Sequence, residues 1–362
     1  MRNNCIRKNL LILLLTLLLI NLSCSVFAAK QTKIDLETAV TMALENNLNL
    51  KIAKVELARV SLEYQQNKAS NLVNVSRYND LEAEINLKSA QNTYQNTKYQ
   101  VITDTIKQYT GLWLATYDLK VKAKQLEVRK RLVKEAKAQY KIGNIGTTDL
   151  IEKENDYSDT KLALETATDD YQQYIRELKR SLGLREEAEL VLADLSSENS
   201  WQITEDQVVS TALKNSLELI LKEKNLELAQ IDAERAKISD AELDKKIKGK
   251  KVAAARLDKE NTGDELENSV REDYHDFKES IEKIALTKDI WDETQEEYKI
   301  SKKQYDVGLL TRTEAMQYEV SMMEAKYNYL SAIANYYLAK QALQQEMNLQ
   351  SGVFEDGTAE SQ

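Results

Sequence analysis

Two stretches of the chain carry an apolar residue at every seventh position on both sides of a glycine. The glycine is Gly143 in the first stretch and Gly308, 165 positions later, in the second. A strict heptad kept over about four repeats favours supercoiled helices over ordinary amphipathic ones. The pattern predicts two long antiparallel coiled-coil hairpins. The repeated positions are Leu112, Leu119, Leu126, Val133, Tyr140, Leu150, Tyr157, Leu164, Tyr171 and Leu178, and then Phe277, Ile284, Trp291, Tyr298, Tyr305, Ala315, Met322, Tyr329, Tyr336 and Leu343.

Each predicted turn carries a Tyr-x-x-Gly motif followed by an acidic residue. The first motif occupies residues 140–143 and precedes Asp149, and the second occupies residues 305–308 and precedes Glu314. Glycine suits a tight turn because it adopts positive φ angles at little cost. Duplication of a whole unit indicates an architectural repeat rather than a catalytic loop.

A second motif opens each half of the chain. Residues 43–48 read Ala-Leu-Glu-Asn-Asn-Leu, and residues 212–217 read Ala-Leu-Lys-Asn-Ser-Leu. The halves are therefore two tandem repeats, at 29–199 and 200–349, followed by a disordered polar tail at 350–362. We expect helices over about 35–69, 81–142, 148–182, 204–247, 266–306 and 312–348, with breaks at about 70–80 and 248–265. A connector at about 184–199 contains a candidate short strand at 189–193.

The composition fits an all-α chain with long uninterrupted helices. The 362 residues include no proline and only nine glycines. Proline disrupts helix interiors, so its absence removes the strongest helix breaker. Charged residues make up 30% of the chain and hydrophobic residues 42%, which suits long solvated coiled coils better than one compact core.

The first 28 residues have the features of a secretory signal peptide. Three basic residues precede an apolar run at 10–22, and residues 26–28 read Val-Phe-Ala, a typical cleavage site. One alternative is a single-span anchor, but the apolar run is shorter than the ~20 residues that a transmembrane helix needs. Another is a lipoprotein in which Cys24 is lipidated and tethers the chain to a membrane, although Asn21 is unusual at its position. We therefore expect an exported protein.

Several classes of chemistry are disfavoured by the sequence. Both cysteines, Cys5 and Cys24, lie in the signal, so the exported chain has neither disulfides nor thiol chemistry. His275 is the only histidine, so one chain offers no histidine-based metal site or acid–base pair. No nucleotide-binding glycine motif or serine-nucleophile motif occurs. We expect no enzyme activity, no metal and no cofactor.

The charge of the chain disfavours nucleic acid as a partner. Cleavage of the signal removes three basic residues and no acid, so the formal net charge falls from −9 to −12. A nucleic-acid-binding protein needs a basic face for the phosphates. The many carboxylates alternate with lysines in patterns typical of solvated helix surfaces.

The two tandem halves, each opened by an Ala-Leu-x-x-(Asn/Ser)-Leu motif and centred on a Tyr-x-x-Gly turn, resemble the TolC family of outer-membrane efflux proteins. The resemblance covers about 34–349. It implies a homotrimer whose twelve helices form a hollow tunnel across the periplasm. Such a conduit is the exit duct of a tripartite efflux pump or type I secretion system in the outer membrane. It also implies that a periplasmic adaptor (membrane fusion) protein docks at the hairpin tips and connects them to an inner-membrane pump.

One feature of the family is missing from the sequence. In the family each half also carries a β-hairpin that contributes to a membrane barrel, and a membrane strand needs ~9–11 alternating residues. The corresponding stretches, 70–80 and 248–263, show one short alternating fragment and a lysine-rich run. We therefore expect a TolC-like helical tunnel protomer with little or no β-barrel, which leaves its relation to the membrane open.

The resemblance places the candidate site residues at the two turns. It implies that Asp149 pairs with Tyr305 to close the tunnel end, and that three copies of Glu314 form a cation-attracting ring at the entrance. The alternative is that both acids stabilise helix N-termini capped by Thr148 or Thr313. The candidate adaptor-docking residues are Ile142, Gly143, Ile145, Val307, Gly308, Leu309 and Leu310. The alternative for the apolar members of this set is packing among themselves.

Two functions are compatible with these sequence features. The first is an efflux or secretion conduit that docks an adaptor at its tips. The second is a structural coiled-coil protein of the cell envelope that conducts no substrate. A third hypothesis is that the chain is itself an adaptor. Adaptors, however, flank their hairpin with glycine-rich β domains, and the sequence contains no such segment.

Overall fold

In the computed structural model, residues 33–73, 75–196, 201–239 and 241–349 are described, and they are almost entirely helical. The predicted signal peptide and the predicted tail lie outside the described residues. No helix in the described residues is long and apolar enough to cross a lipid bilayer. The helices are α2 (Leu36–Asn46), α3 (Leu48–Asn71), α4 (Arg77–Lys141), α5 (Thr147–Ser181), α6 (Glu205–Asn215), α7 (Leu217–Ser239), α8 (Glu242–Asp306) and α9 (Arg312–Glu346).

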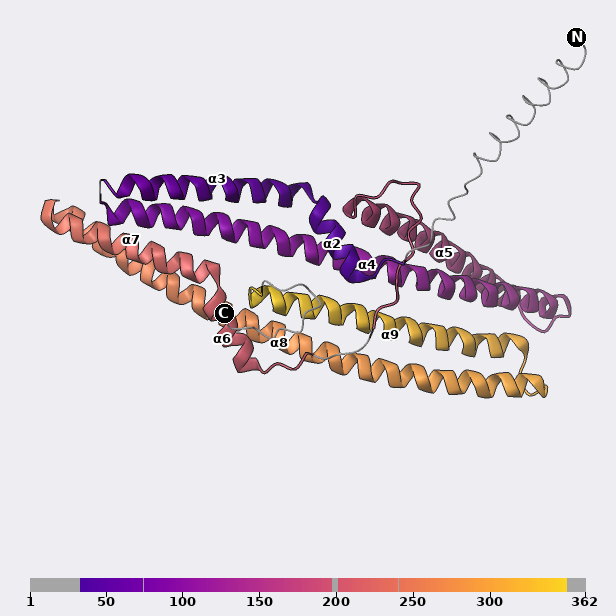
Figure 1. Ribbon diagram of the computed structural model, residues 1–362. Helices are drawn as coiled ribbons and strands as arrows, with labels where there is room; N and C mark the ends of the chain where they lie inside the picture. The colour runs from indigo at the N-terminus through magenta and orange to yellow at the C-terminus, as the bar shows by residue number, and fades with distance from the viewer. Residues whose placement is uncertain (1–32, 74, 197–200, 240, 350–362) are drawn as a thin grey trace, which may run out of the picture.

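Two helices run the whole length of the molecule and organise the rest (Figure 1). These helices, α4 and α8, have 65 residues each, which corresponds to roughly 100 Å at ~1.5 Å per residue. In the half that contains the two turns, the helices lie side by side in the order α5, α4, α9, α8. In the other half the order is α3, α4, α7, α8. The fold is therefore a layer of helices with a free edge on each side.

The heptad positions face the helix partners, and their burial is strongest near the middle of the rods. Leu178 and Leu343 are fully buried, as are Leu112 and Phe277. Most of the equivalent positions nearer the turns are only half-buried, and Tyr140 and Tyr305 at the turns themselves are exposed. The predicted pair of coiled-coil hairpins is confirmed. The decrease in side-chain burial toward the turns shows that the thin hairpins alone cannot exclude water.

The middle of the molecule holds two apolar clusters, one for each repeat. The short helices α2 and α6 contribute their apolar faces to these clusters, and α4 and α8 form the opposite wall. Tyr109 lies fully buried in the first cluster with its hydroxyl against the carbonyl oxygens of Ile34 and Ala193, at 3.0 and 2.8 Å. The predicted short strand at 189–193 is reduced to one parallel bridge between Ile34 and Leu192.

The Ala-Leu-x-x-(Asn/Ser)-Leu motifs perform the same task in both repeats, through the asparagine at their fourth position. The Asn46 side chain donates to the Leu182 carbonyl at 2.9 Å, and Asn215 donates to the Met347 carbonyl at 3.2 Å. Each asparagine thus satisfies a free carbonyl at the end of the returning helix, α5 or α9. The duplicated motif is explained by this fastening of the first helix of a repeat to its last.

The two fastened helix ends use different residues at the left-handed position that follows the helix. Gly183 has a φ of +69°, and a Cβ at this position would lie 2.7 Å from the Asn46 side chain. The equivalent position 165 residues later is Asn348, with a φ of +49°. Asparagine tolerates this left-handed conformation better than other side chains, and here its side chain donates to the Asn215 carbonyl at 2.9 Å.

Three predicted boundaries are wrong. The break expected at 248–265 does not exist, because α8 is continuous from Glu242 to Asp306 and the interruption falls between Ser239 and Glu242. Ion pairs such as Lys248–Asp232 and Lys222–Asp258 hold this part of α8 against α7. The helix expected over 35–69 is divided into α2 and α3, and the helix expected over 204–247 is divided into α6, α7 and the start of α8.

The physical cause of the divisions at Asn47 and Ser216 is a polar side chain that starts a new helix. Asn47 accepts a hydrogen bond from the Leu50 N–H at 2.9 Å, and Ser216 accepts one from the Leu219 N–H at 3.1 Å. Such side-chain acceptors stabilise the free N–H groups of a helix N-terminus. At each of these two bends, one N–H group of the new helix is therefore satisfied by a side chain.

Candidate functional site at the hairpin tips

The two tips have the same backbone geometry. Gly143 and Gly308 have φ angles of +76° and +79°, and their N–H groups donate to the carbonyls of Tyr140 and Tyr305, both at 3.0 Å. The next residue in each turn donates to the carbonyl five positions back, at 2.9 Å in the first tip and 2.8 Å in the second. This pair of bonds is the Schellman motif, which ends a helix through a left-handed residue. There is room for a side chain at both positions, because a Cβ would meet nothing within 4 Å. Glycine is therefore required by the positive φ angle and not by a lack of space.

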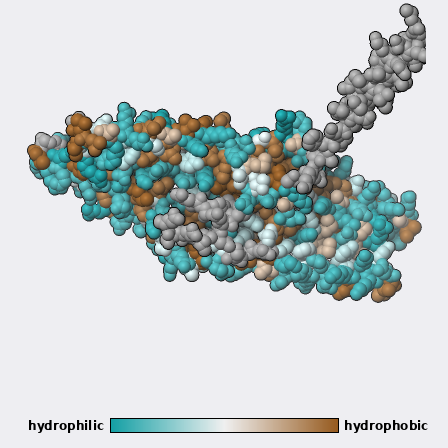
Figure 2. Space-filling view, viewed as in Figure 1, coloured by the Kyte–Doolittle hydropathy of each residue, from teal (hydrophilic) through white to brown (hydrophobic). Residues whose placement is uncertain are grey.

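The tips expose aliphatic side chains to solvent. Ile142 is 71% exposed in the first tip, and Val307 and Leu309 are 72% and 75% exposed in the second. Ile145 and Leu310 are half-buried. Figure 2 shows these apolar spots at the ends of two otherwise hydrophilic rods. Within one chain, Ile142, Val307 and Leu309 are thus not covered by packing among themselves.

The two acids at the tips accept hydrogen bonds at the starts of the returning helices. Asp149 accepts from the Gly146 N–H at 3.0 Å. Glu314 accepts from the Thr311 N–H at 2.7 Å and from its hydroxyl at 2.8 Å. These bonds lower the pKa of Glu314, because they stabilise the charged form. The caps of these helices are Gly146 and Thr311 rather than the expected Thr148 and Thr313.

Tyr305 and Asp149 are not joined by a hydrogen bond in the described part of one chain. The Tyr305 ring is 42% exposed. A contact between it and an acid of a neighbouring copy stays a prediction. Among the described residues, no group of three or more histidine, cysteine or acidic side chains could hold a metal ion.

Polar contacts align the two hairpins with each other. Lys124 of α4 pairs with Glu319 of α9 at 2.8 Å, and Gln125 donates to Glu324 at 2.6 Å. Nearer the tips, the buried hydroxyl of Thr313 donates to Glu135. The tips are therefore held in near register, which allows one partner to contact both.

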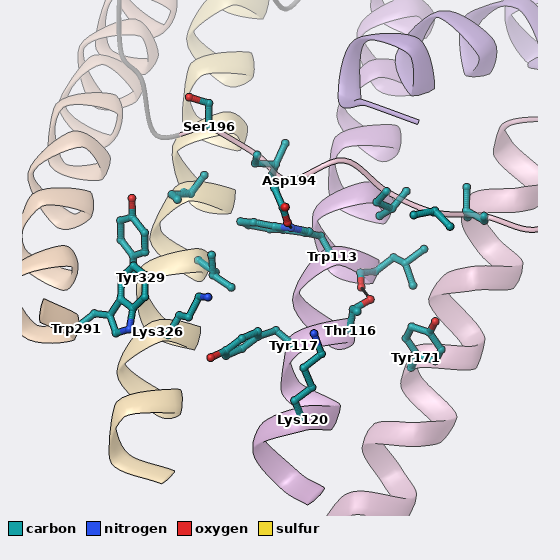
Figure 3. A pocket seen from close by; sticks show the side chains of 17 residues that line it. Trp113, Thr116, Tyr117, Lys120, Tyr171, Asp194, Ser196, Trp291, Lys326 and Tyr329 are labelled. Atoms are coloured by element: carbon teal, nitrogen blue, oxygen red, sulfur yellow. Dashed lines mark hydrogen bonds between the residues drawn. The ribbon is translucent and has the colours of Figure 1, made fainter. Parts of the chain in front are cut away.

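A second candidate site is a cavity of about 710 Å³ between the hairpins, near the middle of the molecule. Figure 3 shows its aromatic and lysine side chains, which come from α4, α5, α8 and α9, and the connector adds aliphatic and polar side chains. Trp291 stacks on Tyr329 with ring centroids 5.4 Å apart. The Lys326 ammonium lies 5.1 Å from the Trp291 ring and 5.3 Å from the Tyr117 ring. These cation–π contacts join α8, α9 and α4.

The sequence did not predict this cavity. Trp291 and Tyr329 fall on heptad positions, so they were expected only to pack. Lys326 carries no recognisable motif, and its position between two rings depends on how the hairpins meet. No sequence signal could have shown that the connector closes one side of the cavity, where Asp194 accepts a hydrogen bond from the Trp113 indole at 3.2 Å.

The arrangement of helices defines a TolC-like helical tunnel protomer, and solved structures of outer-membrane channels share it. The CmeC outer membrane channel of Campylobacter jejuni matches with a TM-score of 0.65 and 13% identity, over 89% of this chain and 86% of that chain. The outer membrane protein VceC of Vibrio cholerae matches with a TM-score of 0.64 and 12% identity, over 86% and 96%. The outer-membrane channel OprN matches with a TM-score of 0.63 and 13% identity, over 86% and 89%.

No family model and no curated protein matches the sequence. The chain nevertheless has the fold of TolC-family outer-membrane channels along most of its length. The predicted resemblance and fold class are confirmed.

Proposed function

We propose that the chain is one protomer of a trimeric helical conduit for efflux or type I secretion, exported to the periplasm or outer membrane, with an adaptor docked at its tips. The observation that carries the proposal is the open layer of helices. In the tip half, α5 and α8 are the two edges. An open layer can close only by edge-to-edge contact with further copies, and closed ring symmetry is the usual outcome of such head-to-tail contacts.

The two edges carry complementary apolar stripes. On α8, Leu286, Ile290 and Ile300 are exposed, and on α5, Ile151 and Leu162 are exposed. Contiguous apolar surface on a helix face is typical of a helix partner. We infer that α8 of one copy packs against α5 of the next, and the resemblance to the family favours three copies.

Introduced cysteines test this contact, because residues 29–362 contain no cysteine. Trp291 stacks on Tyr329 across the second hairpin, so the equivalent positions in the first, Leu126 and Leu164, lie at a similar height. Ile290 immediately precedes Trp291 and Leu162 lies two residues before Leu164, so these two residues lie at a similar height along the rods. In the variant with Ile290→Cys and Leu162→Cys, we expect mild oxidation to give covalent trimers on denaturing gels.

The matched control combines Leu162→Cys with Ile300→Cys. Ile300 lies ten residues further along the same edge, roughly 15 Å away, beyond the reach of a disulfide. We expect at least a tenfold lower yield of crosslinked product from this pair. Equal crosslinking of both pairs, or a monomer in solution by light scattering, would contradict the trimer.

The exposed tips support adaptor docking. Their aliphatic side chains lie at the ends of thin hairpins, where an α-helical hairpin of a partner can pack against both tips. Interface cores of this kind rely on a few buried apolar anchors. We infer that Ile142, Val307 and Leu309 are these anchors, whereas Gly143 and Gly308 shape the turns and Ile145 and Leu310 support them. Asp149, Tyr305 and Glu314 remain the proposed gate at the tunnel end.

A photo-crosslinking amino acid placed at Val307, in cells that make the protein, tests docking. We expect an adduct with a hairpin-containing adaptor, and at least a tenfold loss of that adduct when Ile142→Ser and Leu309→Ser are added. The covalent trimer described above should still form in this variant, so a failure of docking is distinguished from a failure of assembly. A crosslinker at Ile238, at the opposite end of the molecule, is the control. Adaptor adducts at both positions, or at neither, would contradict docking at the tips.

The structural envelope protein is the alternative function. The 710 Å³ cavity and the tip surfaces are compatible with either function, but a protein that only spaces or tethers has no need of a hollow assembly. Negative-stain images decide between them: a threefold ring with a central bore supports the conduit, and a solid rod supports the alternative.

A further inference from the structure

The end of the molecule opposite the tips exposes a second group of aliphatic side chains. They lie at the end of α3 and just after it (Leu72, Val73 and Val75) and at the meeting of α7 and α8 (Ile238 and Leu243). Leu72, Val73, Val75 and Ile238 are between 83% and 91% exposed. Figure 2 shows apolar surface at this end of the molecule. Within the part of the chain that the structure describes, nothing covers these side chains.

Cross-helix contacts bring the two hairpin ends together. Arg77, at the start of α4, pairs with Glu227 of α7, and Lys224 pairs with Glu84 at 3.1 Å. The Arg235 guanidinium lies 4.8 Å from the centre of the Tyr78 ring. Both aliphatic groups therefore belong to one end surface, formed by the neighbouring ends of the α3–α4 and α7–α8 hairpins (Figure 1).

Lysines lie beside this apolar surface on α8. Residues 245–251 read Lys-Lys-Ile-Lys-Gly-Lys-Lys in a chain whose net charge is −9. Two of these lysines have acidic partners, since Lys248 pairs with Asp232 and Lys245 with Glu242. Lys246, Lys250 and Lys251 are exposed and form no ion pair within the described residues.

The same lysines share a helix face with apolar residues. Ile247 follows Leu243 by four positions, and Lys250 and Lys251 follow Ile247 by three and four, which places them on one side of α8. Lys246, Ile247, Lys250, Lys251 and Ala254 together line a shallow surface depression. A helix face that combines lysines with aliphatic residues is typical of segments that lie at a membrane surface.

From this end surface we infer that the protein adsorbs to anionic lipid through Leu72, Val73, Val75, Ile238 and Leu243, with Lys246, Lys250 and Lys251 contacting the headgroups. The aliphatic side chains enter the headgroup boundary, and the lysines are attracted by the negative surface. The contact is interfacial. It does not depend on the proposed conduit, because a single chain already presents the whole surface.

The charges favour lipid over two other occupants. A second copy placed end to end would bring the same three unpaired lysines close together, and like charges repel. Nucleic acid would be attracted by the lysines, but it offers no apolar environment for the exposed aliphatic side chains. A fluid anionic bilayer satisfies both groups, and a flat surface without a deep groove is what such a bilayer contacts.

Vesicle cosedimentation tests the proposal. Residues 29–362 are mixed with vesicles of phosphatidylcholine alone or with 30% phosphatidylglycerol at low salt. We expect binding to the anionic vesicles only, with a fall of at least tenfold in the variant with Lys246→Gln, Lys250→Gln and Lys251→Gln. The matched control is Lys134→Gln with Lys302→Gln and Lys303→Gln, three exposed lysines of the tip half that form no ion pair among the described residues. This control should bind like the parent protein.

A fluorescent reporter tests the apolar part separately. In Ile238→Trp, we expect a blue shift of the emission on anionic vesicles and quenching by lipids with brominated acyl chains, beyond any change in the parent protein. Three results would overturn the inference: no binding of the parent to anionic vesicles, equal losses in the two lysine variants, or a reporter that remains in water when the protein is bound. Failure of the trimer crosslink would leave this inference unaffected.

Discussion

Asp273→Asn is expected to stabilise the protein by about 1–3 kcal/mol at pH 8 and to weaken its pH dependence. Partial burial, and after it the carboxylates of Glu346, Asp276 and Glu272, together raise the pKa of Asp273 from 3.8 to about 6. A rise of this size corresponds to about 3 kcal/mol at most. The ionised carboxylate therefore destabilises the fold at neutral and alkaline pH.

The sign of the pH dependence follows from the direction of the shift. Between pH 3.8 and about 6 the folded chain holds a proton on Asp273 that the unfolded chain releases. This site therefore makes the protein more stable as the pH falls through about 6, and the gain is complete below the unfolded value. The pKa of Glu346 on α9 is also raised by burial, so the variant should retain part of the effect.

Urea unfolding at pH 8 and pH 5 measures both the gain in stability of Asp273→Asn and its weaker pH dependence. The control is Asp289→Asn, an exposed residue of the same helix without an ion pair among the described residues, which changes the net charge equally. If the control gains as much stability as Asp273→Asn, general charge repulsion explains the gain and the buried site does not.

Phe277→Ala is expected to destabilise the protein by about 3–5 kcal/mol. Phe277 is 1% exposed in the second apolar cluster. Its ring centre lies 5.2 Å from that of Trp201 and 5.7 Å from that of Tyr336. Loss of the ring leaves a cavity between α8, α9 and the chain before α6, where three aromatic side chains meet.

Tyr318→Ala is the control, because Tyr318 is an aromatic residue of α9 that is 41% exposed. We expect it to cost less than about 1 kcal/mol. Chemical denaturation followed by tryptophan fluorescence measures both variants, and Trp201 reports directly on the cluster. A cost below about 1 kcal/mol for Phe277→Ala would mean that the middle of the rods is not the stabilising core.

The duplicated motifs in the sequence predicted the parts of the fold that depend on local hydrogen bonding. The Tyr-x-x-Gly motifs gave both turns because a left-handed residue at Gly143 and Gly308 ends a helix wherever it occurs. The Ala-Leu-x-x-(Asn/Ser)-Leu motifs were recognised as repeats, but their structural purpose was not. The carbonyls that accept from Asn46 and Asn215 lie more than 130 residues away along the chain.

The wrongly predicted break in α8 has a tertiary cause. The lysine-rich segment at 248–265 was expected to interrupt a helix, since it contains Gly249 and Gly263 and little apolar pattern. Glycine costs only about 1 kcal/mol in a helix, and ion pairs to α7 such as Lys222–Asp258 favour the helical conformation. Tertiary contacts thus outweigh a weak local preference.

The sequence by itself determined the all-α class, the two repeats, both turns and the exposure of Ile142, Val307 and Leu309 at the tips, because heptads and helix-ending glycines act within a few residues of each other. Only the tertiary structure decided the order of the helices in the layer, the aromatic and lysine cavity between the hairpins, and the joining of two hairpin ends into one basic, aliphatic surface. These features depend on which helix faces meet, and that choice is made by the summed packing of residues far apart in the chain.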